Sequence, residues 1–214
     1  MKSFGDLSGF FTPPAHGGKA SSLVIIMHGW GADAADLADL AYPISLRFPG
    51  AAFFVPNAPD PCSANPMGRQ WFEINDMVNG PQQAAGFIEA SVAAACAELD
   101  LGMDAVALTG FSQGGMMSLH CGLHMQDSPA AIVSFSGALL QSATIPAHPR
   151  PPAVLLVHGT DDAVVPFDRM DAAAKVLAAK DIEVECFARP GVGHGIDPDA
   201  LTRAIDYLSK HLPA

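Results

Sequence analysis

Short, nearly continuous apolar runs alternate along the chain with longer segments in which apolar residues recur every three or four positions. A short apolar run is typical of a strand in a parallel sheet covered on both faces, whereas the longer period is typical of an amphipathic helix. The predicted strands are residues 23–28, 51–55, 105–109, 131–135, 154–158 and 182–187. The predicted helices are residues 33–48, 81–99, 113–125, 167–179 and 197–212.

This alternation predicts an α/β fold in which a mostly parallel central sheet has helices on both faces. Residues 56–80 and 136–152 are rich in Pro, Gly, Ser and Asn, and we expect surface loops there because strands of the same sheet resume after each. No internal repeat is present. A length of 214 residues is most simply one domain, residues 1–214.

The stretch GFSQG, residues 110–114, lies where a predicted strand passes directly into a predicted helix. A G-x-S-x-G sequence in that context indicates a nucleophile elbow, in which a serine occupies a strained turn and the glycines avoid steric collisions. Ser112 is therefore the candidate nucleophile. An ordinary strand–helix connection uses the same common residues, so the interpretation depends on finding partners for the serine.

A serine nucleophile needs a base to take its proton and an acid to orient that base. In hydrolases with this elbow, the acid and then the base follow on loops after later strands. The segment HGTDDAVVP offers Asp161 and Asp162 after one predicted strand, and GVGHGI places His194 just before the last helix. The chain order and the positions of these residues predict a Ser, Asp, His triad, with either aspartate as the acid.

The negative oxygen that forms when serine attacks a carbonyl needs hydrogen-bond donors. The amide of Gln113, directly after the nucleophile, is one expected donor. The glycine-rich loop MHGWGAD after the first predicted strand offers the amide of Trp30 as the second. A plain strand–helix turn explains the same glycines equally well.

Six segments together resemble one known family. They are LVIIMHGWGAD, PNAP, WFEI, GFSQGG, HGTDDAVVP and GVGHGI, and they extend over nearly the whole chain. The chain resembles the phospholipase/carboxylesterase family of α/β-hydrolases, which includes the acyl-protein thioesterases. This resemblance implies hydrolysis of small-molecule carboxylic esters or thioesters through an acyl-enzyme, with no metal or organic cofactor. It also selects Asp162 as the acid, through the pattern H-G-x-x-D-x-x-V-P, and assigns an oxyanion donor to Trp30.

Composition and charge exclude several other classes. A formal charge of −11 argues against nucleic acid and anionic lipid as partners, since both are bound by clustered Lys and Arg. The N-terminal segment lacks the apolar core of a secretory signal, and no stretch is long and apolar enough to predict a membrane span. The four scattered cysteines fit a reduced protein. These features predict a cytoplasmic location.

The other histidines have simpler interpretations. His28 and His158 each precede a glycine at a strand end and are expected to be structural. His120 and His124, spaced four residues apart on a predicted helix beside Cys121, could face one metal ion. No third ligand is evident, so no metal site is predicted. The remaining histidines are expected on the surface and are His16, His148 and His211.

Large side chains in the irregular segment 56–80 are candidates for the substrate pocket. They are Met67, Trp71, Phe72 and Met77, and the indole of Trp30 joins them from the preceding glycine-rich loop. Core packing explains Trp71 and Phe72 equally well.

The sequence therefore predicts a serine carboxylesterase. An acyl-protein thioesterase or a lysophospholipase would use the same residues, and a binding protein that resembles a hydrolase but does not turn over is the non-enzymatic alternative. The sequence leaves open whether the chain forms a homodimer.

Overall fold

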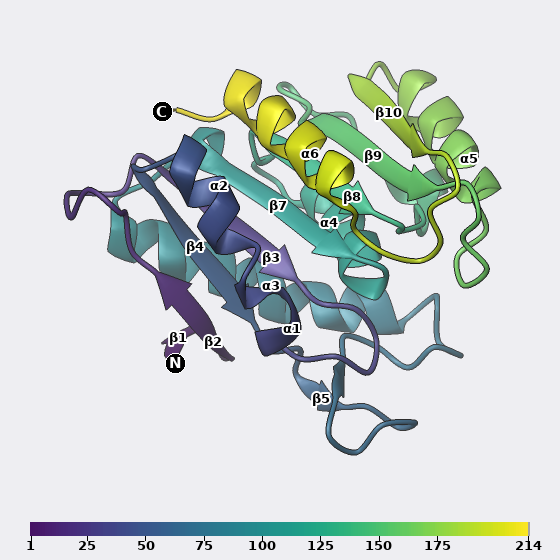
Figure 1. Ribbon diagram of the computed structural model, residues 1–214, viewed down its shortest axis with the longest axis horizontal. Coiled ribbons are helices and arrows are strands. Elements are labelled where there is room, and N and C mark those ends of the chain that lie inside the picture. The colour runs from purple at the N-terminus through teal and green to yellow at the C-terminus, as the bar shows by residue number, and fades with distance from the viewer. Residues whose placement is uncertain (214) are drawn as a thin grey trace.

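The structure, a computed structural model that describes residues 1–213, is built around an eight-stranded sheet (Figure 1). Across the sheet the strands lie in the order β1 (Lys2–Phe4), β2 (Leu7–Thr12), β4 (Ala51–Pro56), β3 (Ser22–Met27), β7 (Val106–Phe111), β8 (Ala131–Phe135), β9 (Ala153–Gly159) and β10 (Val184–Arg189). The six strands from β4 to β10 are parallel, whereas β2 pairs antiparallel with both β1 and β4. The predicted α/β fold with a mostly parallel sheet is confirmed.

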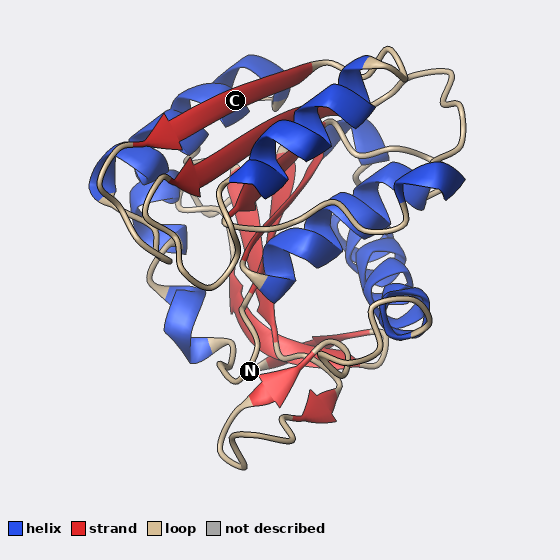
Figure 2. Ribbon diagram, turned by 90° about the vertical axis from the view of Figure 1, so that its right-hand side faces the viewer, coloured by secondary structure: helices blue, strands red, loops and turns tan. Residues whose placement is uncertain are grey.

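Helices cover both faces of this sheet (Figures 1 and 2). On one face lie α1 (Ala35–Ala38), α2 (Ala41–Arg47) and α6 (Pro198–His211), and on the other lie α3 (Gly80–Leu99), α4 (Gln113–His124) and α5 (Asp168–Ala178). Short 3-10 turns span Met103–Ala105 and Ser142–Thr144. None of the helices within residues 1–213 has the length and hydropathy that crossing a bilayer requires.

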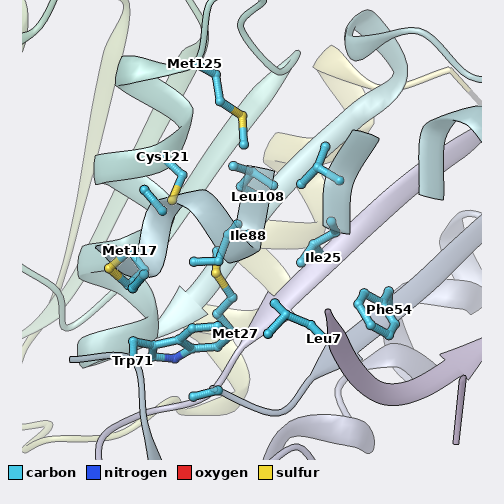
Figure 3. Close-up of a cluster of buried hydrophobic side chains, with 14 of the residues drawn as sticks. Leu7, Ile25, Met27, Phe54, Trp71, Ile88, Leu108, Met117, Cys121 and Met125 are labelled. Carbon is cyan, nitrogen blue, oxygen red and sulfur yellow. The ribbon is translucent and has the colours of Figure 1, made fainter. Parts of the chain in front are cut away.

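The apolar runs are continuous because each central strand contributes side chains to both faces of the sheet. In β3, Ile25 and Met27 pack toward α3 and α4, whereas Val24 and Ile26 pack toward α2 and α6. Figure 3 shows the first of these clusters, in which Trp71 lies near the end of β3. The helix ends also follow the sequence, since the Asp197 carboxylate accepts a hydrogen bond from the Ala200 amide at the start of α6.

Two predicted elements differ from the structure. The single helix expected over 33–48 is two short helices, because Pro43 has no amide hydrogen and its ring would collide with the carbonyl four residues earlier, at Asp39. The N-terminal hairpin of β1 and β2 was not predicted. Residues 56–80 are mostly irregular, as expected, and contain only the small pair β5 (Asp60–Pro61) and β6 (Arg69–Gln70).

The passage from β7 into α4 requires glycine for steric reasons. A Cβ atom on Gly110 would lie 2.4 Å from the backbone of Gly114, and one on Gly114 would lie 2.0 Å from the carbonyl oxygen of Met27 in β3. These contacts let α4 begin directly against the carboxyl end of β3. The turn between β7 and α4 is thereby held against the centre of the sheet.

We expect Gly114→Ala to lower the free energy of unfolding by about 2 kcal/mol or more, because its methyl group has no room beside the Met27 carbonyl. Gly86→Ala is the matched control, since Gly86 also lies in a helix and a Cβ there would meet no atom within 4 Å. That control should raise stability by about 0.5–1 kcal/mol. Urea denaturation of both variants measures the difference, and equal effects would contradict the close approach of α4 to β3.

Candidate active site

Ser112 lies at the turn between β7 and α4 in a backbone conformation that side chains rarely adopt. Its φ is 55° and its ψ is −118°, outside the common regions for residues other than glycine. The surrounding backbone holds it there, since the Ser112 amide donates to the carbonyl of Phe135 at 2.8 Å and its own carbonyl accepts from the Met116 amide at 2.9 Å. This turn presents the hydroxyl at the carboxyl end of the sheet.

Asp162 and His194, which follow β9 and β10, form a short hydrogen bond. The distance from His194 Nδ1 to Asp162 Oδ2 is 2.7 Å, and the amides of Val164 and Val165 both donate to Asp162 Oδ1 at 2.9 Å. Burial by itself would raise the pKa of Asp162, but the hydrogen bonds from His194, Val165 and Val164 hold that pKa below its ordinary value. The ionised carboxylate therefore fixes the proton of His194 on Nδ1 and leaves Nε2 as an acceptor.

The two histidines expected to be structural are buried and have partners in the fold. His158 lies with its Nε2 atom 2.8 Å from the Val165 carbonyl and 3.3 Å from Asp162 Oδ2, the same oxygen that His194 contacts. His28 Nε2 accepts a hydrogen bond from the Ala58 amide at 3.0 Å. His158 thus adds a polar neighbour to the buried carboxylate.

Ser112 and His194 line the same cleft, which has a volume of about 840 Å³. The ring of Phe111 packs against the imidazole of His194 at a centroid distance of 4.7 Å and restricts where the imidazole can lie. Within residues 1–213 the Ser112 hydroxyl makes no hydrogen bond to His194, and this bond is often long before substrate binds. Asp161 is exposed and lies outside the cleft lining.

The backbone next to Ser112 supplies free hydrogen-bond donors. Trp30 and Gln113 both line the cleft, and neither amide has an acceptor in the described part of the chain. Gln113 is the first residue of α4, where the amide has no partner within the helix. The structure therefore brings together the three triad candidates and the two candidate oxyanion donors.

The structure does not place Met67, Trp71 or Phe72 on the wall of this cleft. Met67 is 88 % exposed at the tip of its loop, whereas Trp71 and Phe72 are buried in the core shown in Figure 3. The indole of Trp71 donates to the His28 carbonyl at 2.9 Å, which keeps it beneath the cleft floor. Of the predicted pocket residues, Trp30 and Met77 line the cleft.

An apolar wall makes up most of the cleft, and sequence reasoning found little of it. Its apolar side chains come from five separate segments and are Leu37, Ile74, Met77, Met116, Ala138, Leu139, Leu140, Val164, Val165 and Pro166. The adjacent pair Leu139 and Leu140 in the irregular segment 136–152 was a further available signal. Asp36 and Arg169 also line the cleft.

Both ring nitrogens of His124 have partners in the fold, whereas the buried Nδ1 atom of His120 has none within residues 1–213. His124 Nδ1 lies 2.8 Å from the His120 carbonyl, and His124 Nε2 lies 3.0 Å from Thr144 Oγ1. Burial, together with the neighbouring His124, lowers the pKa of His120 to about 4. Across residues 1–213 no three His, Cys, Asp or Glu side chains are grouped so as to hold a metal ion.

Comparisons with known proteins identify the family of the chain. A family model described as Phospholipase/Carboxylesterase matches residues 14–212. The chain is 27 % identical to Esterase YpfH of Escherichia coli, over 91 % of this chain and 84 % of that protein. It is 29 % identical to Acyl-protein thioesterase 1 of Mycosarcoma maydis, over 94 % of this chain and 95 % of that protein.

A solved structure is similar over nearly the whole chain. The crystal structure of esterase PE8 superimposes with a TM-score of 0.91 at 35 % sequence identity, and covers 96 % of this chain and 99 % of that one. The structure of Arabidopsis thaliana SOBER1 has a TM-score of 0.81 at 24 % identity, which supports the fold alone.

The lowered pKa of His120 predicts how stability depends on pH. In an unfolded chain a histidine takes up a proton near pH 6.5, whereas buried His120 stays neutral down to about pH 4. Between these values the unfolded state binds more protons, so the free energy of unfolding should fall as the pH is lowered from 6.5 to 4. Urea denaturation at several pH values in this range measures the free energy of unfolding. It should change less with pH in His120→Gln than in His124→Gln, and an identical pH dependence would contradict a neutral His120.

Proposed function

Because the chain belongs to the phospholipase/carboxylesterase family of α/β-hydrolases, we propose that it is a serine carboxylesterase with a triad of Ser112, Asp162 and His194. The hydrogen bond between His194 and the buried Asp162 carboxylate, beside a serine held at a strained turn, is the observation that carries this proposal. We further propose that residues 1–214 act as one α/β-hydrolase domain.

The acylation step begins with a proton transfer. His194 Nε2 takes the proton of the Ser112 hydroxyl while Ser112 Oγ attacks the carbonyl carbon of the ester. The resulting negative oxygen accepts hydrogen bonds from the amides of Trp30 and Gln113. As the tetrahedral intermediate collapses, the bond to the leaving alcohol or thiol breaks, His194 donates its proton to that group, and Ser112 retains the acyl group.

Water then repeats the chemistry in the deacylation step. His194 takes a proton from the water as it attacks the acyl carbon, and returns that proton to Ser112 Oγ as the carboxylic acid leaves. Asp162 stabilises the imidazolium that forms in both steps, and its lowered pKa keeps it ionised while it does so. Every group used in these steps belongs to the chain itself or to the substrate.

The apolar wall of the cleft suits the acyl part of a small-molecule ester. An acyl-protein thioesterase is the second candidate function, because several relatives carry that name, including the one from Mycosarcoma maydis. Thioesters and esters share the same tetrahedral chemistry. Turnover of an S-acylated peptide compared with an aryl ester of the same acyl chain distinguishes the two functions.

We expect Ser112→Ala to reduce kcat by about 10³- to 10⁶-fold while leaving the fold intact, because the attacking oxygen is removed. A fluorophosphonate probe should label the natural chain in one-to-one ratio and should not label this variant. Ester hydrolysis measures the rate, and thermal unfolding checks the fold. A binding protein without turnover would give neither labelling nor hydrolysis, and a variant that keeps a tenth of the activity would mean that another residue is the nucleophile.

The two adjacent aspartates should respond very differently to the same substitution. Asp162→Asn should reduce kcat by about 10³-fold or more, because an amide at this position stabilises the wrong tautomer of His194. Asp161→Asn is the matched control and should cost less than about tenfold, since this exposed side chain bonds only to the neighbouring Thr160 hydroxyl. Steady-state hydrolysis of one ester by both variants gives the ranking, and the reverse order would overturn the assignment of Asp162.

A further inference from the structure

One loop contacts both segments that carry the oxyanion donors. This loop, residues 60–73, is called the clamp loop here, and it contains β5 and projects from the body of the molecule (Figure 1). It pairs with the segment around Trp30, since the Gly31 amide donates to the Arg69 carbonyl at 2.9 Å and the Arg69 amide donates to the Ala32 carbonyl at 2.8 Å. Asn65 Nδ2 adds a third bond, to the Gly31 carbonyl at 2.7 Å.

The segment around Trp30 needs such support. Gly29 and Gly31 flank Trp30, and Gly31 has a φ of +77°, so this backbone is intrinsically free to move. Within residues 1–213 the Trp30 amide has no acceptor of its own to hold it in place. The bonds from Asn65 and Arg69 hold Gly31 and Ala32, directly after Trp30. The Gly29 carbonyl, which shares a peptide unit with the Trp30 amide, lies 2.8 Å from His28 Nδ1, so the segment is held on both sides of Trp30.

The same loop holds the second donor through the side chain of Gln113. Gln113 Oε1 accepts from the Trp71 amide at 2.9 Å, and Gln113 Nε2 donates to the Phe72 carbonyl at 2.8 Å. This side chain is only 1 % exposed, and both ends of its amide are paired with backbone groups of the clamp loop. A buried amide paired at both ends is fixed in one orientation, and it fixes the backbone of its own residue as well.

The clamp loop is itself anchored between the two donors. The Trp71 indole donates to the His28 carbonyl at 2.9 Å, and the Trp30 indole donates to Gln70 Oε1 at 2.9 Å. Gln70 Nε2 in turn donates to the Glu73 carboxylate at 2.6 Å. A continuous hydrogen-bonded path therefore joins the Trp30 segment to the first residue of α4 through the clamp loop.

We infer that Gln113 and Asn65 are positioning residues, which hold the clamp loop against both donor segments and so set the distance and orientation between the Trp30 and Gln113 amides. This inference rests on the proposed function. Oxyanion donors stabilise the transition state only when they already point at the position of the negative oxygen. A misplacement of about 1 Å can cost about 10²-fold in rate, so the side chains that fix the two amides affect the rate without touching the substrate.

Gln113→Leu tests the inference most directly. Leucine keeps the backbone amide and the apolar bulk but removes both bonds to Trp71 and Phe72. We expect kcat for an acetyl ester to fall by about 10- to 100-fold with KM changed by less than about threefold. The reason is that misplaced oxyanion donors weaken the stabilisation of the transition state more than the binding of the substrate. A trifluoromethyl ketone inhibits such an enzyme when Ser112 Oγ attacks its carbonyl carbon, which gives a tetrahedral oxyanion like that of the ester reaction. The Ki of this inhibitor should rise by a similar factor.

Asn65→Asp is the second variant, and Asn65 is exposed, so folding should be preserved. The aspartate keeps the acceptor that binds the Met67 amide but replaces the donor to the Gly31 carbonyl with a negative oxygen. We expect kcat to fall by about three- to tenfold. Asn79→Asp is the control, since it makes the same charge change at an exposed residue outside the clamp loop and should leave kcat unchanged within about 1.5-fold.

Rates are expressed per active site, counted by fluorophosphonate titration, so that partly unfolded protein does not mimic a slow enzyme. The double variant of Gln113 and Asn65 should lose less than the product of the single losses, because both substitutions loosen the same loop. The inference would be overturned if the variants of Gln113 and Asn65 changed thermal stability alone and kept kcat and the inhibitor Ki within about twofold of the natural chain. If Gln113→Leu does not fold, the comparison of Asn65→Asp with Asn79→Asp decides it alone.

Failure of the proposed function gives a different result. In that case the natural chain would not be labelled, or Ser112→Ala would retain activity, whatever the clamp-loop variants do.

Discussion

The close approach of α4 to the carboxyl end of β3 is the steric constraint on which the site depends. Gly114 touches the Met27 carbonyl without a side chain between them, so the chain must reverse within the few residues around Ser112. That reversal forces Ser112 into a strained conformation, and such strain persists only where surrounding structure holds it. The bond from the Ser112 amide to Phe135 in the neighbouring strand supplies part of that support. The reactive hydroxyl is thus positioned by backbone packing.

The electrostatics of the site follow from placing one carboxylate in the interior and giving it several partners. Asp162 has a fully buried side chain, yet it accepts hydrogen bonds from His194 and from two backbone amides, and His158 lies next to it. A buried charge without partners would take up a proton, but this one is held ionised, as its lowered pKa indicates. The imidazole can therefore gain a proton during the reaction beside a compensating negative charge. Because the Asp162 side chain is buried, its attraction to a protonated imidazole is stronger than it would be in water.

The clamp loop, although irregular, connects the two segments that carry the candidate oxyanion donors. It has almost no regular secondary structure, but its backbone and side chains bond to the Trp30 segment on one side and to Gln113 on the other. Its bulky residues Trp71 and Phe72 are buried in the core, and the wall of the cleft is formed by side chains from other loops and from α1 and α4.

The sequence by itself determined those features that depend on residues close together in the chain. Chain order left Asp161 and Asp162 as alternatives for the acid, and the resemblance to the family selected Asp162. The apolar runs predicted the central strands, and the spacing around Ser112 predicted the sharp turn. These signals are local and periodic, so they can be detected in a single chain. Only the tertiary structure decided what lies next to each side chain, because those neighbours come from distant segments: Trp71 lies in the core, and Gln113 binds loop residues about forty positions away. No periodic pattern encodes such contacts, which depend on how the loops pack after the sheet has formed.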